Sequence, residues 1–268
     1  MRAWQLPAGC TSVGRLELIE LPRPDPAPGE VLVRVRANSL NYRDQAIAKG
    51  TYFGSAIKVA GTPLSDGAGV VEAVGAGVTG LAPGDRVAGT FFQSWLEGPP
   101  IAAKGEALGC PPAKGMLADY VTLPEKGVVK LASSLGFEEA ATLPCAGVTA
   151  WNALMTGVRP LERGQTVLLI GTGGVSLLAL RIAKSAGARV IATSQGDANP
   201  MALMIKGASL RGIFVGSAAM ARDLNAFVDA HRVKPVVDRV FDFADAKAAY
   251  AYQSSGELFG KVVIANRA

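Results

Sequence analysis

One stretch near the middle of the chain restricts its fold more than any other. Gln165–Ile170 is a continuous apolar run, which predicts a parallel strand buried on both faces. A glycine-rich turn at residues 171–174 follows directly, and apolar residues then recur at helical spacing until Gly187 ends the helix. Arg189–Thr193 is typical of a second strand. The order of strand, glycine turn, helix and strand predicts a βαβ unit.

The glycine turn has the features of a dinucleotide-binding site. One glycine makes the tight turn, the next lets the backbone approach a pyrophosphate, and the start of the helix offers unpaired N–H groups and a positive dipole end. The sixth position of the pattern is Ser176, where glycine or alanine is usual. A turn that packs tightly and binds nothing is the alternative. We predict that Gly171, Gly173, Gly174 and Val175 bind the cofactor.

The end of the second strand bears on the choice of cofactor. An NAD site places Asp or Glu there to bind the ribose 2′-hydroxyl. This chain has Thr193 and Ser194 instead, with Asp197 just beyond. A hydroxyl can donate a hydrogen bond to a 2′-phosphate, and the missing carboxylate removes a repulsion against it. NADP(H) is therefore favoured over NAD(H), with Ser194 as a cofactor-binding residue, although the nearby Asp197 weakens this inference.

Composition excludes several other classes of protein. The chain is 49% hydrophobic and 18% charged, which excludes a disordered protein. The net charge of +5 is scattered without a basic cluster, which argues against nucleic-acid binding. The most apolar stretch, Leu177–Ala192, is interrupted by charged residues, so no membrane span is expected. Three cysteines without paired spacing and an amino terminus without an apolar leader predict a cytoplasmic protein.

The kind of secondary structure that the sequence predicts changes twice along the chain. Residues 1–124 alternate short apolar runs with Gly- and Pro-rich turns, which is typical of a small barrel or sandwich. Residues 125–232 alternate between helical and strand patterns, which is typical of an α/β domain. Residues 233–268 are mixed, with a helix near Ala244–Tyr252 and a strand at Lys261–Ala265. We predict one domain made of residues 1–124 and 233–268, and a dinucleotide-binding domain at 125–232.

Six short stretches, distributed over nearly the whole chain, have recognisable sequence patterns: Ala37–Asp44, Pro63–Gly69, Leu81–Val87, Leu143–Trp151, the glycine turn and Phe259–Val263. In these stretches the chain resembles the medium-chain dehydrogenase/reductase superfamily, and more narrowly its zinc-independent, quinone-oxidoreductase-like branch. The resemblance implies an α/β plus β fold, in which a GroES-like barrel catalytic domain is joined to a Rossmann cofactor domain. The active site would lie in the cleft between the two domains.

The resemblance also implies roles for single residues. Asn41 and Tyr42 would face the nicotinamide and the substrate, with Tyr42 positioning a carbonyl or donating a proton; a buried aromatic at a helix start is its alternative. Thr149 would lie near the nicotinamide, or pack inside a helix. Asp66 would lie near the cleft as a third catalytic candidate, or act as a structural cap. Lys261 would reach the cofactor phosphates, or be an exposed strand lysine.

The sequence offers poor ligands for zinc. A catalytic zinc needs three protein ligands. The single histidine, His231, is expected at the exposed end of a helix, and Cys10, Cys110 and Cys145 lie far apart in the sequence. Where zinc-dependent relatives would have a His-Glu pair, this chain has Ser65-Asp66. We therefore predict that no metal is bound. Hydride would pass to a quinone or an α,β-unsaturated carbonyl, with a hydrogen-bond donor stabilising the enolate oxygen.

The predicted Rossmann domain is too short for six strands. After Ser194 only four residues precede Asn199–Met204, which together with Ser209–Gly216 resembles the approach to the family's last Rossmann strand. Roughly 60–80 residues, or two to three βα units, have no candidate in the chain. The deletion would expose an edge of the first strand. The chain is then a catalytically poor deletion form, a reduced domain whose last strand pairs with its first, or a sequence that joins two parts of a longer chain.

These observations leave three functions open. The first is a zinc-independent NADP(H)-dependent oxidoreductase, a homodimer acting on a small-molecule substrate. The second is a non-catalytic binding or dimerisation protein that keeps the barrel and a damaged nucleotide site, because the deletion removes one wall of the cofactor crevice. Alcohol dehydrogenase-like activity without zinc is a minor third possibility.

Overall fold

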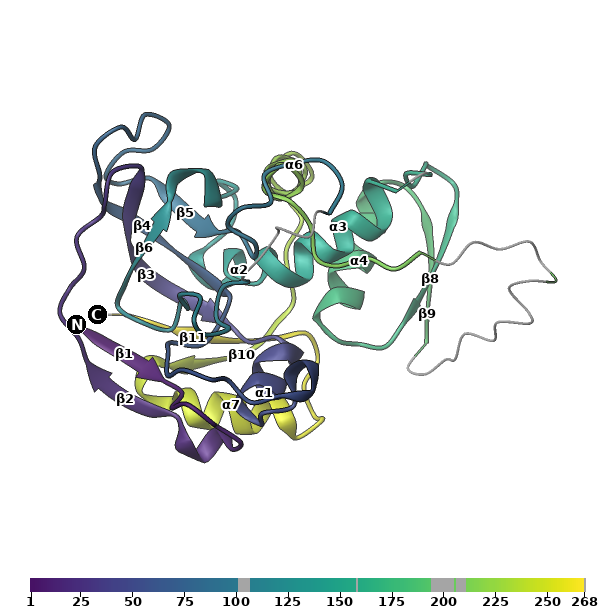
Figure 1. The fold of residues 1–268 in the computed structure, drawn as a ribbon. Coiled ribbons are helices and arrows are strands. Elements are labelled where there is room, and N and C mark those ends of the chain that lie inside the picture. Colours follow the sequence, from purple (N-terminus) through teal and green to yellow (C-terminus); the bar gives the residue numbers. More distant parts are fainter. Residues whose placement is uncertain (101–106, 158, 194–204, 206–210, 268) are drawn as a thin grey trace.

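A computed structural model describes residues 1–100, 107–157, 159–193, 205 and 211–267 of the chain (Figure 1). Its strands are β1 (Arg2–Gln5), β2 (Glu17–Glu20), β3 (Glu30–Ser39), β4 (Asp66–Val74), β5 (Arg86–Gly89), β6 (Tyr120–Pro124), β7 (Val128–Lys130), β8 (Thr166–Ile170), β9 (Arg189–Thr193), β10 (Val237–Asp242) and β11 (Lys261–Ala265). Seven of them form one main sheet in the order β10-β11-β3-β4-β5-β7, with β6 also paired to β3. The other four form two separate pairs, β1-β2 and β8-β9.

The ten-residue strand β3 organises the main sheet. It pairs in antiparallel fashion with β4, β6 and β11, and β10 joins through parallel pairing with β11. Val31, Val33 and Val35 alternate along the strand on one face of the sheet and are at most 1% exposed. The pairings end at β10 and β7, so the described strands do not close into a complete barrel.

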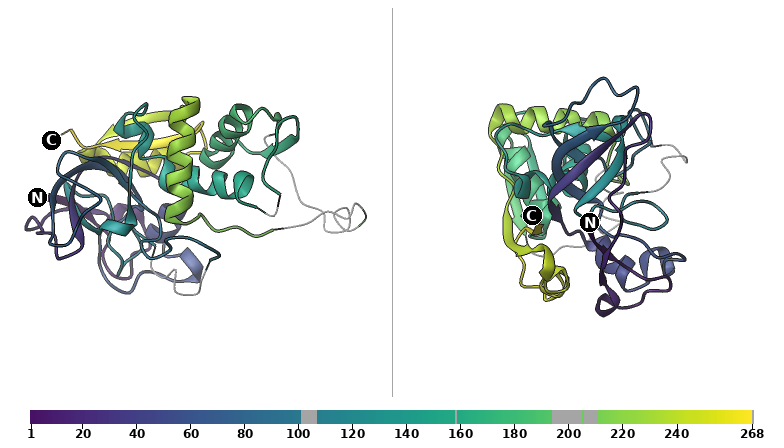
Figure 2. Two further views of the ribbon diagram at one scale, coloured as in Figure 1. Left: turned by 90° about the horizontal axis from the view of Figure 1, so that it is seen from above. Right: turned by 90° about the vertical axis from the view of Figure 1, so that its left-hand side faces the viewer.

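The helices lie where apolar residues recur at helical spacing. They are α1 (Tyr42–Ala48), α2 (Phe137–Ala140), α3 (Val148–Met155), α4 (Gly174–Ser185), α6 (Ala218–His231) and α7 (Ala246–Ser254), and a π-helical turn at Leu143–Gly147 leads into α3. The predicted helix near 244–252 and the one after the glycine turn are confirmed. Figures 1 and 2 show α6 between the main sheet and the β8-β9 pair. Ile182 of α4 and Leu224 of α6 are fully buried in one apolar core with residues of the main sheet.

The β8-β9 pair corrects one prediction. The two strands are parallel and α4 packs on them, as the βαβ pattern predicts. However, Leu168, Ile170 and Ile191 are 60%, 48% and 57% exposed, so β8 is not buried on both faces. The apolar composition of the strand is that of a central parallel strand, but among the described residues only one helical layer covers it. An uncovered face is what the expected loss of βα units predicts, because helices normally cover both faces of a parallel sheet.

The described residues also bear on how the shortened domain is completed. β8 pairs with β9 alone among the described strands, and residues 211–216 do not form a strand beside it. The direct pairing of a last strand with β8 is therefore wrong for this part of the chain. The junction at Ser194–Met204, including Ser194 itself, lies outside the described residues. None of the described helices combines the length and apolarity that a membrane span requires.

Candidate functional site

A cleft of about 580 Å³ lies where the glycine turn meets the start of α1 and the segment leading into β11. It brings together seven residues that the sequence analysis predicted as site residues, from three distant parts of the chain: Asn41, Tyr42, Gly171, Gly173, Gly174, Val175 and Lys261. An isolated bridge between Gly173 and Gly260 ties the glycine turn to the residue before β11. The cleft therefore lies between the two predicted domains, because each of them contributes one wall.

The glycine turn leaves its backbone open on the cleft side. Gly171 has φ +90°, a conformation that residues with a Cβ rarely adopt. A Cβ built on Gly173, which is the N-cap of α4, would meet no atom within 4 Å. The Ser176 hydroxyl donates to the Ile170 carbonyl at 2.8 Å, so the unusual sixth residue closes the turn from inside. The first N–H groups of α4 have no side-chain cap from Gly173, which suits a phosphate ligand.

The third glycine of the turn, Gly174, makes room for the Lys261 side chain. A Cβ on Gly174 would collide with Cδ of Lys261, so the lysine stem crosses the start of α4 where no side chain stands. Lys261 is only 4% exposed, and its Nζ donates to the Leu40 carbonyl and to Asn41 Oδ1, each at 2.5 Å. Lys261 is therefore not the exposed strand lysine considered as its alternative, and it lines the cleft. Its ammonium group holds Asn41 in place.

The two other catalytic candidates of α1 and β4 differ sharply in exposure. Tyr42 is 87% exposed at the rim of the cleft, so it is not the buried aromatic considered as its alternative. Asp66 is fully buried and does not line the cleft. Its carboxylate accepts from the Ser65 hydroxyl at 2.9 Å and from the Cys145 N–H at 3.3 Å. Burial raises the pKa of Asp66, and the nearby Lys261 ammonium opposes that rise.

A second carboxylate lies in the same buried region. Asp44 accepts the Asn41 N–H at 2.7 Å across the first turn of α1. Burial raises the pKa of Asp44 to about 6, against the opposing effect of the Arg43 guanidinium. The Lys261 ammonium opposes the rise in pKa of both buried carboxylates, Asp44 and Asp66, because its positive charge favours their ionised forms.

The remaining predicted residues lie elsewhere. Thr149 is on α3, and its hydroxyl donates to the Cys145 carbonyl at 2.7 Å; it is not among the residues lining the cleft. His231 is the exposed last residue of α6, as expected, and its ring lies 4.2 Å from that of Phe227. The three cysteines Cys10, Cys110 and Cys145 are free thiols.

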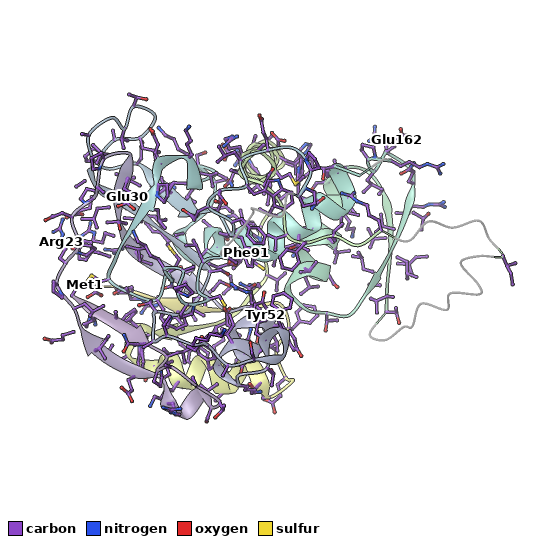
Figure 3. The ribbon with its side chains drawn as sticks, viewed as in Figure 1. Met1, Arg23, Glu30, Tyr52, Phe91 and Glu162 are labelled. Atoms are coloured by element: carbon purple, nitrogen blue, oxygen red, sulfur yellow. The ribbon has the colours of Figure 1, made fainter. Side chains whose placement is uncertain are left out.

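A second cavity, of about 460 Å³, lies on the other side of the start of α1. Four aromatic rings line it, together with the Arg43 side chain and Cys110; the rings are those of Tyr52, Phe53, Phe92 and Phe214. The Arg43 guanidinium lies 5.1 Å from the Tyr52 ring and 4.6 Å from the Phe91 ring, two residues near the centre of Figure 3. Sequence reasoning missed Arg43, although an arginine between apolar and acidic neighbours at the start of a buried helix was a signal for it.

Comparison with known proteins decides the family. Residues 27–133 match the model of the alcohol dehydrogenase GroES-like domain, and residues 153–264 match that of a zinc-binding dehydrogenase domain. A zinc-type alcohol dehydrogenase-like protein of Schizosaccharomyces pombe is 36% identical, over 88% of this chain and 91% of its own. The chain belongs to the medium-chain dehydrogenase/reductase superfamily. As a member of that superfamily it is an oxidoreductase with a GroES-like part and a partial Rossmann part.

Two further proteins are similar to this chain over nearly its whole length. The 2-methylene-furan-3-one reductase of Solanum lycopersicum is 27% identical, over 98% of this chain and 79% of its own. The crystal structure of an alcohol dehydrogenase from Sinorhizobium meliloti superposes with a TM-score of 0.87 at 33% identity, over 99% of both chains. The alignment with the S. pombe protein spans 316 residues, more than the 268 of this whole chain. The relative therefore has residues that this chain lacks, which confirms the expected shortening.

Proposed function

We propose that this chain is an NADPH-dependent reductase that acts on a quinone or an α,β-unsaturated carbonyl without zinc. The observation that carries the proposal is the cleft in which the glycine turn meets Asn41, Tyr42 and Lys261. A cofactor on the turn and a carbonyl beside α1 would be held against each other there. The likeness to a plant furanone reductase adds support, because that protein is named for the reduction of a conjugated ketone.

The residues of the cleft fit a dinucleotide. The open backbone at Gly171 and Gly173 would receive the pyrophosphate, and the amino end of α4 would face its negative charge. NADPH, when bound, would supply a hydride to the substrate. The preference for NADPH rests on Thr193, which ends β9 where an NAD site would carry Asp or Glu. With the pyrophosphate on the turn, the ribose would extend toward this strand end.

The same residues do not fit a catalytic zinc. Among the described residues, no three side chains of the metal-binding types gather at one point. At the position of the relatives' His-Glu pair, both oxygens of Asp66 already accept hydrogen bonds from Ser65 and Cys145. Burial raises the pKa of the Cys145 thiol strongly, which disfavours the thiolate that zinc requires. The proposed reaction therefore depends on hydrogen-bond donors rather than on a metal.

The chain's own residues have defined tasks in this proposal. Lys261 fixes the Asn41 side chain, so its amide keeps one orientation beside the cleft. Tyr42 presents a hydroxyl at the rim, where it can donate to a substrate oxygen. The apolar side chain of Val175 lines the same cleft, is 41% exposed and would exclude water once covered by a ligand.

A matched pair of glycine substitutions tests the proposal. Gly173 and Gly212 both leave open space where an added Cβ would stand and both have negative φ, so alanine should fold at either position. Gly173→Ala puts a methyl group where the pyrophosphate approaches, and we expect NADPH affinity, measured by cofactor fluorescence, to fall about tenfold or more. Gly212→Ala should leave it unchanged. The absence of any saturable signal up to millimolar NADPH in the unmodified protein would overturn the proposal.

One observation favours the second candidate, a non-catalytic binding or dimerisation protein. Among the described strands β8 has one unpaired edge, and with the exposed Leu168 and Ile191 this edge forms an apolar surface of the kind that partners cover. The NADPH titration discriminates here as well, because this candidate predicts no binding. The homodimer stays a prediction on either view.

A further inference from the structure

The Arg43 guanidinium is buried with one nitrogen unused. Arg43 is 8% exposed; its Nη1 donates to the Leu108 carbonyl at 2.6 Å and its Nε to the Tyr52 hydroxyl at 3.3 Å. Its Nη2 has no hydrogen-bond partner among the described residues. A buried donor without an acceptor is costly, typically by about 1–3 kcal/mol and more for a charged group. Such a group is expected to gain its acceptor from a ligand.

The side chain remains charged in this position. Burial acts to lower the pKa of Arg43, but the combined effect of the Asp44 carboxylate, the Tyr52 hydroxyl and Cys145 outweighs it and raises the pKa. Within the described parts of the chain, no carboxylate oxygen forms a salt bridge with the guanidinium. Its direct partners are neutral oxygens and aromatic rings, so its positive charge is not cancelled by contact with an anion.

Aromatic and apolar side chains form most of the wall of the cavity beside Arg43, and Lys58 and Ser55 also line it. Tyr52 and Phe53 lie with ring centroids 4.4 Å apart, and Phe92 and Phe214 lie 5.4 Å apart. Its volume of about 460 Å³ is in the range of small-molecule sites. Burial raises the pKa of the Cys110 thiol, which keeps this part of the wall uncharged. Flat apolar ligands with one polar oxygen match such a cavity.

We propose that Arg43 is a substrate-binding and catalytic residue that takes the carbonyl oxygen of an aryl-substituted conjugated ketone or quinone in this aromatic cavity. The inference rests on the proposed function and adds the substrate class. Asn41 and Tyr42 line the cofactor cleft and Arg43, next in the chain, lines the aromatic cavity, so consecutive residues at the start of α1 form part of both walls. The family motifs in the sequence did not indicate this role.

The chemistry balances with NADPH as the reductant. The β-carbon of the conjugated ketone gains a hydride and the C=C π electrons move to the carbonyl oxygen, while NADPH is oxidised to NADP⁺. The Arg43 Nη2–H donates to the resulting enolate oxygen and stabilises its negative charge, as an oxyanion-hole donor does. The α-carbon then takes a proton from water, which gives the saturated ketone. No further oxidant or reductant is required.

The main test compares two arginines with similar contacts. Arg86 also donates to a main-chain carbonyl, that of Leu135, and lies 4.9 Å from the Phe137 ring, but it lines neither cavity. We expect Arg43→Gln to lower kcat/KM for benzalacetone by about 100-fold, because it removes an oxyanion donor. Arg43→Lys should restore part of that loss, whereas Arg86→Gln should change it less than about twofold. Equal losses in both glutamine variants would overturn the proposal.

A second measurement covers the case in which Arg43→Gln does not fold. Phe53 is 80% exposed on the cavity wall, so Phe53→Ala removes an aromatic surface without opening the core. We expect this variant to lower the ratio of kcat/KM for benzalacetone to that for methyl vinyl ketone by at least about threefold, because only the first substrate has a ring to stack. An unchanged ratio contradicts the aromatic cavity as the substrate site.

Benzoate binding separates failure of the inference from failure of the proposed function. Calorimetry without NADPH should detect benzoate binding to the unmodified protein and to Arg86→Gln, with roughly tenfold or more weaker binding to Arg43→Lys, because lysine lacks the planar fork that matches a carboxylate. If this pattern holds but no carbonyl is reduced with NADPH, the reductase proposal fails and Arg43 remains a ligand site. If carbonyls are reduced but the Arg43 substitutions change neither benzoate affinity nor kcat/KM, the reductase proposal stands and the inference is overturned.

Discussion

The main sheet and the β8-β9 pair are built from similarly apolar strands but bury them very differently. Val33 of β3 and Leu123 of β6 are each 1% exposed, whereas Leu168 of β8 is 60% exposed. β3 has strands on both sides and helices or further strands over its faces, whereas β8 has one neighbouring strand and one covering helix among the described residues. The burial of an apolar strand is therefore set by the layers around it rather than by its own composition.

Lys261 joins the two regions, and its removal is expected to have the largest effect. Lys261→Met takes away the ammonium that Asn41 accepts from and that offsets the charge of buried Asp66. Loss of one partner from a buried charged cluster costs about 3–5 kcal/mol. We expect a loss of that size in the free energy of unfolding measured in urea, together with weaker NADPH-dependent activity.

The control for Lys261 is an exposed lysine of the main sheet. Lys130 pairs with Asp85 at 3.0 Å, with its side chain 59% exposed. Lys130→Met should cost less than about 1 kcal/mol, because exposed ion pairs contribute little. If both variants unfold at the same urea concentration, the two regions are not connected through Lys261.

Two leucine truncations test the comparison itself. Leu123→Ala removes a side chain from the buried face of the main sheet and should cost about 3 kcal/mol of unfolding free energy. Leu168→Ala removes one from the open face of β8 and should change stability by less than about 0.5 kcal/mol. Thermal and urea unfolding of the two variants provide the measurement. A large loss for Leu168→Ala would mean that this face is covered in solution.

The last comparison concerns pH dependence rather than stability at a single pH. Burial raises the pKa of Asp44 to about 6, so the folded chain binds this proton more tightly than the unfolded chain does. Ionisation of Asp44 therefore lowers stability as the pH rises from about 4 to about 6, and the cost is constant above that. Asp44→Asn removes the cost, so its stability relative to the unmodified protein should increase across this pH window in urea titrations.

A carboxylate with the opposite shift is the control. Burial acts to raise the pKa of Asp119, but hydrogen bonds from Arg2 and Asn266 outweigh it and lower the pKa. Its stabilising contribution is present above the unfolded pKa and is lost as the pH falls. Asp119→Asn should therefore lose stability relative to the unmodified protein as the pH rises. The same sign for both variants would contradict the environment assigned to Asp44.

Local patterns predicted the elements of the βαβ unit well. β8, the glycine turn, α4 and β9 lie within a residue or two of the predicted ranges, because apolar spacing and glycine act through neighbouring residues. The exposure of Leu168 was not predictable in this way, since it depends on which layers are present. Of the residues that line the cleft, the glycine turn was predicted from its own pattern and Asn41 from the resemblance. The resemblance implied that Lys261 reaches the cofactor phosphates, and in the structure its ammonium donates to Leu40 and Asn41.

From the sequence alone we predicted the βαβ unit, the helix before β11 and the shortening of the Rossmann part, because these are evident in local spacing or in length, and the family followed from a resemblance in six stretches. The tertiary structure was needed to show that the stem of Lys261 passes over Gly174, that Tyr42 is exposed, and that one Arg43 nitrogen beside an aromatic cavity has no hydrogen-bond partner among the described residues. These features arise where distant segments meet. The direction and burial of a side chain at such a point depend on the residues it contacts. When those residues are far apart in the chain, local periodicity in the sequence does not reveal the contact.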